Sequence, residues 1–165
     1  MPRVWVSIGS NLDRERNIRA AVAQLHARFG ALRLSRVYES PAVGFAGGAF
    51  YNLVAGFDTD QSPSELIAAL RAIEDALDRV RGGAKFSSRT IDIDLLTYGD
   101  EVVDHEGLHL PRDEILKYAF VLGPLAEVAP EDRHPVLGLS YRGLWESFDK
   151  DGQPLTPLEL ALDGG

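Results

Sequence analysis

The chain has 165 residues, of which 45% are hydrophobic and 25% are charged, and this composition favours one globular domain, residues 1–165, over a disordered chain. The formal net charge of −8 argues against general binding to nucleic acid or to an anionic membrane. The sequence contains no cysteine, no transmembrane-length apolar run and no secretory leader, so we expect a cytoplasmic monomer without disulfides or thiolate metal sites.

The first third of the chain is expected to contain three strands and one helix. Residues 3–9 ("RVWVSIG") are typical of a short buried strand that ends at a Gly-Ser-Asn turn. Apolar residues recur at helical spacing from Ile18 to Phe29 and predict a helix that ends near Gly30. Residues 32–40 and 51–59 predict a second and a third strand, with a glycine-containing loop between them.

A second helix and a fourth strand complete the predicted core. Ser62, Pro63 and Glu65 form a helix start with a capping box, and the apolar stripe that follows extends to residue 80. Residues 89–98 ("RTIDIDLLTY") predict the fourth strand. The order β-α-β-β-α-β indicates an α+β, ferredoxin-like core, an antiparallel sheet with helices on one face.

The C-terminal extension gives weaker signals. Residues 111–130 suggest a short helix, an apolar segment and a turn, and residues 140–148 suggest one amphipathic helix. The last fifteen residues, "DGQPLTPLELALDGG", look like a tail with at most a short turn of structure.

The fourth strand carries the most informative residues. Side chains two positions apart share a face of a strand, so Asp92 and Asp94 would lie roughly 6.6–7 Å apart. At an effective dielectric constant near 20, two such charges repel each other by roughly 2–2.5 kcal/mol. Each carboxylate could form a salt bridge to a neighbouring strand. Alternatively the pair could bind Mg²⁺, which prefers a few carboxylates, water and phosphate oxygens.

A basic segment directly upstream favours the magnesium alternative. Residues 79–89 ("RVRGGAKFSSR") contain four basic side chains and no acidic one, namely those of Arg79, Arg81, Lys85 and Arg89. Guanidinium groups bind phosphate oxygens well, so an acidic pair beside this segment is the arrangement expected for phosphoryl-type transfer. No P-loop motif is present, the four histidines lack metal-ligand spacing, and the Gly9-Ser10-Asn11 turn could cradle an anion or be a plain turn.

Several segments together resemble one family. "KFSSRTIDIDLL" resembles the signature of 6-hydroxymethyl-7,8-dihydropterin pyrophosphokinase, and "VSIGSNL", "VYESPAVG", "FYNLV" and "FVLGPLAEVAP" resemble its other segments in the same order. The resemblance implies transfer of pyrophosphate from ATP to the pterin hydroxymethyl group, with release of AMP, in the folate pathway. It also implies small-molecule substrates and magnesium as cofactor.

The resemblance assigns roles to particular residues. Asp92 and Asp94 would hold two Mg²⁺ ions. The residues that would contact ATP are Glu74, Arg79, Arg81, Lys85, Phe86, Arg89, Leu95 and Arg112. Four basic residues of this group would also be catalytic, namely Arg79, Arg81, Lys85 and Arg89. The pterin would lie among Ser40, Pro41, Val43, Phe50, Asn52 and Phe120, with Phe50 and Phe120 sandwiching the ring.

The chain also departs from the family pattern. Phe86-Ser87 stands where the family has a large aromatic residue and glycine, and Arg112-Asp113 stands where it has histidine and an aromatic residue. Tyr118 replaces an arginine, a loss for which Arg112 or Lys117 could compensate. Two alternatives therefore accompany an active enzyme: a catalytically weakened paralogue that binds pterin or nucleotide, and a ferredoxin-like interaction domain without a ligand.

Overall fold

The centre of the fold is an antiparallel sheet whose neighbouring strands are far apart in the sequence. The structure is a computed structural model that describes residues 1–41, 48–80, 91–105 and 107–162. Neighbouring strands follow the order β5-β1-β4-β3-β8, and β2 also pairs with β4. The strands are β1 (Arg3–Ser10), β2 (Arg33–Leu34), β3 (Val37–Ser40), β4 (Phe50–Asp58), β5 (Asp92–Tyr98) and β8 (Thr156–Leu158). Because β5 ends this order, it is an edge strand, and α2 packs against it.

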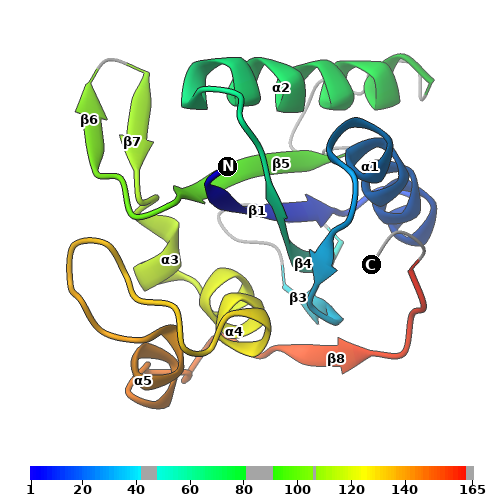
Figure 1. Ribbon diagram of the computed structural model, residues 1–165. Coiled ribbons are helices and arrows are strands. Elements are labelled where there is room, and N and C mark those ends of the chain that lie inside the picture. The colour runs from blue at the N-terminus through cyan, green and yellow to red at the C-terminus, as the bar shows by residue number, and fades with distance from the viewer. Residues whose placement is uncertain (42–47, 81–90, 106, 163–165) are drawn as a thin grey trace.

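Two helices, α1 (Arg14–Phe29) and α2 (Pro63–Val80), cover one face of the sheet (Figure 1). The predicted capping box at the start of α2 is confirmed: the Ser62 N–H donates to Glu65 Oε1 at 2.8 Å, and the Glu65 N–H donates to Ser62 Oγ at 3.2 Å. The main core lies between these helices and the sheet. The helices contribute Ile18, Leu25, Leu66 and Ile73, and alternate strand residues contribute Val4, Val6, Ile8, Ile93 and Leu95.

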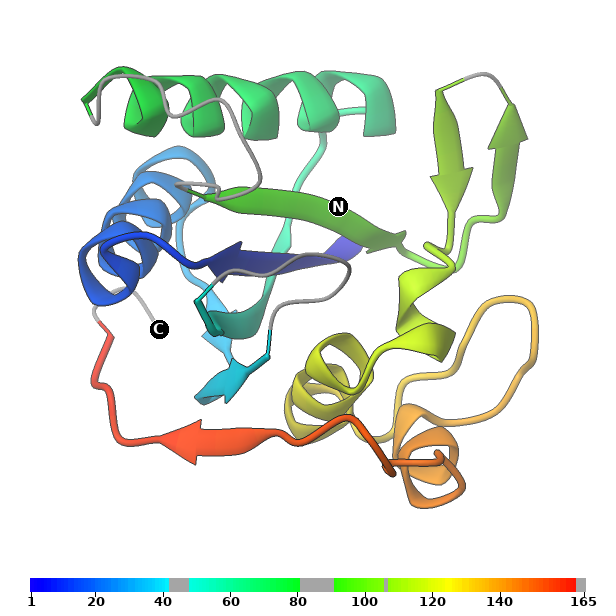
Figure 2. The same cartoon turned by 180° about the vertical axis from the view of Figure 1, so that it is seen from behind.

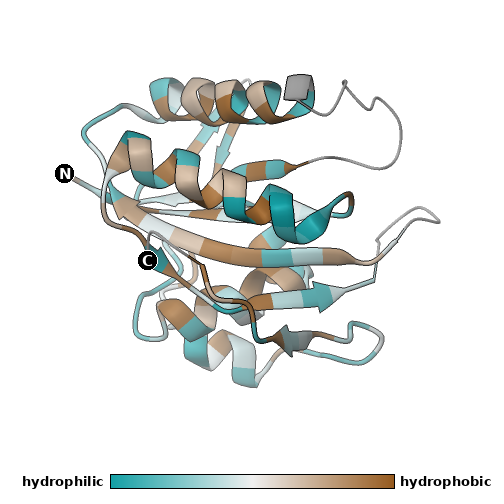
Figure 3. Cartoon of the chain, turned by 90° about the vertical axis from the view of Figure 1, so that its right-hand side faces the viewer, coloured by the Kyte–Doolittle hydropathy of each residue, from teal (hydrophilic) through white to brown (hydrophobic). Residues whose placement is uncertain are grey.

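The opposite face of the sheet is covered by the C-terminal extension. The predicted short helix is α3 (Glu114–Lys117), the apolar segment after it is also helical, α4 (Ala119–Val128), and the predicted amphipathic helix is α5 (Tyr141–Glu146). A second core packs α4 and α5 against Trp5, Val54 and Leu96. Figure 3 shows the sheet between the two helical layers, with hydrophobic stretches along the strands. Helices therefore cover both faces, not one face as the sequence predicted.

The structure corrects two expectations, one for residues 32–40 and one for the C-terminal tail. The expected strand 32–40 is split into β2 and β3, because Ser35 pairs with Val54 partly through its side chain: Ser35 Oγ accepts from the Val54 N–H at 2.9 Å. The C-terminal tail contains β8, which pairs with β3 and runs along the outside of the sheet (Figure 2). Pro157 is tolerated there because β8 is an edge strand.

Two short strands, β6 (Val103–His105) and β7 (Leu108–Leu110), form a separate hairpin after β5. Among the described residues, no helix has the length and apolar character needed to cross a membrane.

Candidate active site

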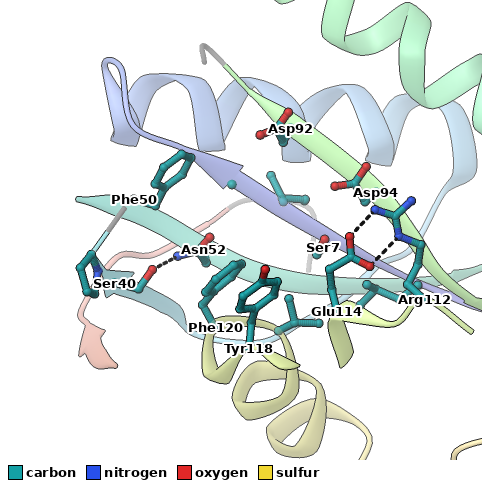
Figure 4. A pocket seen from close by; sticks show the side chains of 15 residues that line it. Ser7, Ser40, Phe50, Asn52, Asp92, Asp94, Arg112, Glu114, Tyr118 and Phe120 are labelled. Carbon is teal, nitrogen blue, oxygen red and sulfur yellow. Dashed lines mark hydrogen bonds and ion pairs between the residues drawn. The ribbon is translucent and has the colours of Figure 1, made fainter. Parts of the chain in front are cut away.

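A cavity of about 290 Å³ lies on the face of the sheet that α4 covers. Strands β1, β3, β4 and β5 all contribute to it, together with the segment from Arg112 to Val121 (Figure 4). Its walls combine an aromatic group (Phe50, Tyr118, Phe120), a buried polar pair (Ser40, Asn52) and a charged group (Asp92, Asp94, Arg112, Glu114). The predicted metal ligands and most of the predicted substrate contacts therefore meet in one cavity.

The two aspartates share one face of β5, as the sequence predicted. Both line the cavity, whereas Ile93 and Leu95 between and after them belong to the core beneath α1 and α2. On β1, Gly9 stands opposite Asp92, and Ser7 stands opposite Asp94. Because these two residues are small, the space above the carboxylates stays open, and the Asp94 side chain is 35% exposed.

Asp94 also has a cationic partner on α2. Arg71 Nη2 donates to Asp94 Oδ1 at 3.1 Å, and Arg71 Nη1 donates to Glu74 Oε1. The other oxygen of the Glu74 carboxylate, Oε2, accepts from the backbone N–H of Ile93 at 2.6 Å. Burial raises the pKa of the Glu74 carboxyl, while the Ile93 N–H and the Arg71 guanidinium act in the opposite direction. The repulsion expected between the two aspartates is thus offset at Asp94 by Arg71.

The aromatic end of the cavity is built from β4 and α4. Tyr118 and Phe120 stack with ring centroids 5.0 Å apart and planes at 16°. Asn52 is 5% exposed, and its Nδ2 donates to Ser40 Oγ at 2.6 Å, so the amide has a fixed orientation. In Figure 4, the rings of Phe50 and Phe120 lie on either side of this amide. A flat heterocycle with hydrogen-bonding edges matches these surroundings in shape and polarity.

Arg112 is held at the charged end. Its backbone N–H donates to Leu96 O at 3.0 Å, and its guanidinium makes two hydrogen bonds to the Glu114 carboxylate, at 3.2 and 2.6 Å. Lys117, the other cation near the missing family arginine, does not line the cavity.

The remaining predicted residues divide into three groups. Pro41 lines the cavity. Leu95 and Glu74 do not line the cavity: Leu95 is 3% exposed in the core on the other face of β5, and Glu74 lies on α2 behind that strand. Arg79 is the penultimate residue of α2. Val43, Arg81, Lys85, Phe86 and Arg89 lie outside the described residues.

Several residues of this region were not among the sequence-based candidates for these contacts, and Gly9, Tyr118, Glu114 and Arg71 are examples. Gly9 lies within β1 and lines the cavity. Arg71 precedes Glu74 by three residues on one helix, and this spacing places the two side chains on a common face, so the sequence did carry a signal for their pairing.

The chemistry of the acidic pair, Asp92 and Asp94, fits Mg²⁺. Two carboxylates that open into a cavity leave coordination positions for water and phosphate oxygens, which is how Mg²⁺ is commonly bound. Within the part of the chain that the structure describes, no group of three or more acidic or histidine side chains forms a metal cluster. Asp92 and Asp94 are thus the carboxylates of the cavity that could hold such an ion.

Fold and cavity together define the class: an α+β protein in which one cavity joins an aromatic, heterocycle-sized end to a carboxylate end suited to metal and polyphosphate, as in small-molecule kinases. Residues 5–130 match the family model of 7,8-dihydro-6-hydroxymethylpterin-pyrophosphokinase (HPPK). The chain belongs to this family of pyrophosphokinases.

Individual relatives agree with this assignment. The chain is 39% identical over 137 residues to the 2-amino-4-hydroxy-6-hydroxymethyldihydropteridine pyrophosphokinase of Pseudomonas aeruginosa, an overlap of 81% of this chain and 84% of that protein. It is 35% identical over 158 residues to the folic acid synthesis protein fol1 of Pneumocystis carinii, which covers 93% of this chain but only 21% of the relative.

Solved structures agree on the fold. Wild-type HPPK-DHPS of Plasmodium falciparum, crystallised with pterin and p-hydroxybenzoate, has a TM-score of 0.70 at 16% identity, over 88% of this chain and 42% of that one. The chain thus spans about a fifth of the Pneumocystis protein and less than half of the Plasmodium one.

Proposed function

We propose that the chain transfers pyrophosphate from ATP to the hydroxymethyl group of 6-hydroxymethyl-7,8-dihydropterin and so works in folate biosynthesis. The observation that carries this proposal is the single cavity that joins Asp92 and Asp94 to Phe50, Asn52 and Phe120. Family membership and the names of the relatives support the same reaction.

The aromatic end is the proposed pterin site. The rings of Phe50 and Phe120 would sandwich the heterocycle, and the Asn52 amide would hydrogen-bond its edge. Ser40 fixes the amide through a hydrogen bond of 2.6 Å, so recognition of the edge would need no rearrangement of that side chain. Pro41 lines the cavity, and Val43, which lies outside the described residues, is proposed as a further contact from the family motif alone.

The charged end is the proposed site of transfer. Asp92 and Asp94 would hold two Mg²⁺ ions, which when bound neutralise charge on the polyphosphate. Arg112 lines the cavity beside these carboxylates, so we infer that Arg112, and not Lys117, takes over the role of the arginine replaced by Tyr118. The hydroxymethyl oxygen would attack the β-phosphorus, the bond to the α-phosphate oxygen would break, and AMP and one proton would be released.

The other nucleotide contacts are proposed from the family motif. Arg79, Arg81, Lys85 and Arg89 would bind the triphosphate, and Phe86 would contact the nucleotide. Leu95 would act only as packing behind the aspartates, because its side chain is 3% exposed on the other face of β5. The strand order β5-β1-β4-β3 supports the inference that the core is of the ferredoxin-like type and that residues 1–165 form one domain.

The decisive experiment follows AMP release in the presence of ATP, Mg²⁺ and the pterin alcohol. We expect release that depends on all three, and loss of most activity in Asp94→Ala with the circular dichroism spectrum of the wild type retained. Absence of AMP at saturating ATP and Mg²⁺ would refute the proposed reaction, and wild-type turnover of the variant would refute the metal role.

A second candidate is a paralogue that binds pterin or nucleotide without turnover. Arg112, Asp113 and Tyr118 favour it, because these residues replace the histidine, aromatic and arginine positions of the family pattern. Calorimetry that detects binding of the pterin alcohol in a preparation that releases no AMP would select this alternative.

A further inference from the structure

Arg71 and Glu74 of α2 hold the aspartate-bearing segment of β5 from the side opposite the cavity. Glu74 binds the backbone N–H of Ile93, the residue between the two aspartates, at 2.6 Å. Arg71 contacts the Glu74 carboxylate through one nitrogen and Asp94 Oδ1 through the other, the latter at 3.1 Å. These contacts form one continuous chain of interactions. It begins at the backbone N–H of Ile93, passes through Glu74 and Arg71, and ends at the side chain of Asp94, the next residue of β5.

This arrangement leaves Glu74 little freedom to bind a nucleotide. Both of its carboxylate oxygens have protein partners, and the residue is 7% exposed. A buried carboxylate that is paired in this way typically serves an orienting role, because releasing it to a ligand would leave the partner N–H of Ile93 buried without an acceptor. This differs from the nucleotide contact that the family resemblance implies for Glu74.

The geometry also suits the proposed role of Asp94. Arg71 engages only one carboxylate oxygen of Asp94, Oδ1, and it approaches from the helix side of β5. Asp94 lines the cavity, and its Oδ2, which Arg71 does not contact, would remain available to a metal ion there. Carboxylates that bind metals are commonly oriented by hydrogen bonds of this kind, and removal of the orienting partner typically costs about 10- to 100-fold in metal affinity.

We propose that Arg71 and Glu74 are positioning residues that set the orientation of Asp94, and the placement of β5 around it, for metal binding. This inference rests on the proposed function. Together the two side chains carry no net charge, so a variant that neutralises both leaves the net charge of the site unchanged.

The test uses a double variant that leaves the net charge unchanged. Arg71→Met with Glu74→Gln removes both charges and the guanidinium fork, but retains a carbonyl oxygen at position 74 for the Ile93 N–H. A matched control is Arg19→Met with Glu15→Gln on α1, because that pair is also an Arg–Glu pair within one helix, with an N–O distance of 3.2 Å and an arginine of similar exposure (42% against 44%).

The primary measurement is Mn²⁺ affinity by electron paramagnetic resonance, in the presence of an ATP analogue with a methylene group between the α- and β-phosphates. We expect the Arg71/Glu74 variant to bind Mn²⁺ about 10- to 100-fold more weakly and the Arg19/Glu15 variant to bind it as the wild type does. A second variant, Arg71→Lys, keeps the charge but loses the planar fork, and an intermediate affinity is expected. Thermal unfolding of each variant separates a loss of fold from a loss of metal affinity.

Wild-type Mn²⁺ affinity in both Arg71 variants would overturn the inference while leaving the proposed function intact. Weak binding in the Arg19/Glu15 control as well would also overturn it, because the effect would then not be specific to β5. Failure of the wild-type protein itself to bind Mn²⁺ with the analogue would instead refute the proposed metal site, and the inference with it.

Discussion

Gly9 provides a direct test of the proposed pterin site. A methyl group added at this position would lie 3.0 Å from Asn52 Oδ1 and 3.6 Å from Phe50 Cδ2, two side chains assigned to the pterin. Asn52 cannot easily turn away, because its Nδ2 is bound to Ser40 Oγ at 2.6 Å in a buried position. Gly9→Ala should therefore reduce the space and disturb the amide at the place where the heterocycle would bind.

The magnitude follows from two opposing effects. An extra methyl group in a packed site costs about 1–3 kcal/mol, whereas alanine in place of glycine within a strand gains about 0.5–1 kcal/mol. The free energy of unfolding should thus fall by no more than about 2.5 kcal/mol, taking the extremes of those two ranges. The same steric cost applied to the bound ligand predicts affinity for the pterin alcohol that is about 5- to 150-fold weaker, since about 1.4 kcal/mol corresponds to a factor of ten.

The assay is calorimetric titration with the pterin alcohol, accompanied by urea unfolding. Gly56→Ala is a control on the adjacent strand β4, because its added methyl group would overlap the indole of Trp5, which is 4% exposed and does not line the cavity. We expect Gly9→Ala to lose affinity and Gly56→Ala to lose stability while its folded protein binds normally. Wild-type affinity in a folded Gly9→Ala protein would refute the assignment of this end of the cavity to the pterin.

Three further predictions concern other parts of the molecule. Arg112→Met should lower kcat for AMP release by about 10²-fold or more with little change in pterin affinity, whereas Lys117→Met should leave kcat unchanged. Gln153→Ala should lower the melting temperature by about 2–8 °C, because it deprives the Ala119 N–H of its acceptor at 2.8 Å and costs about 1–2 kcal/mol. Burial lowers the pKa of His134 in the folded protein, so the unfolded chain binds a proton more readily. The free energy of unfolding measured with urea should therefore decrease as the pH is lowered below about 6.5, and it should decrease less in His134→Asn.

The parts of the fold that were predictable are those in which local patterns decide the structure. Ser62 and Glu65 satisfy each other across one helical turn, and the alternation through Asp92, Ile93 and Asp94 assigns side chains to faces without knowledge of the partners. The residues of α4 were recognised as apolar, but their periodicity did not distinguish a helix from a strand. The helix forms because this segment must cover Trp5, Val54 and Leu96 on the second face of the sheet.

The parts that escaped prediction depend on contacts between distant segments. The edge of β3 is open to a further strand, and only the path of the chain in space brings residues 156–158 to that edge. Arg71 is likewise separated from Asp94 by 23 residues, and the ion pair forms because α2 crosses beside the edge strand β5. Neither contact is encoded in a local motif.

The position of the cavity follows from a gradient along three adjacent strands. On the face toward α4, β1 presents Trp5, Ser7 and Gly9 in turn, so the side chains become smaller along the strand. The side chains of the two neighbouring strands change from apolar to polar in the same direction. On β5, Leu96 is followed on this face by Asp94 and Asp92, and on β4, Val54 is followed by Asn52. Large apolar residues at one end of this face support α4, whereas small and polar residues at the other end leave a space beneath it. The same helix can therefore pack into a core at one end and cover the cavity at the other.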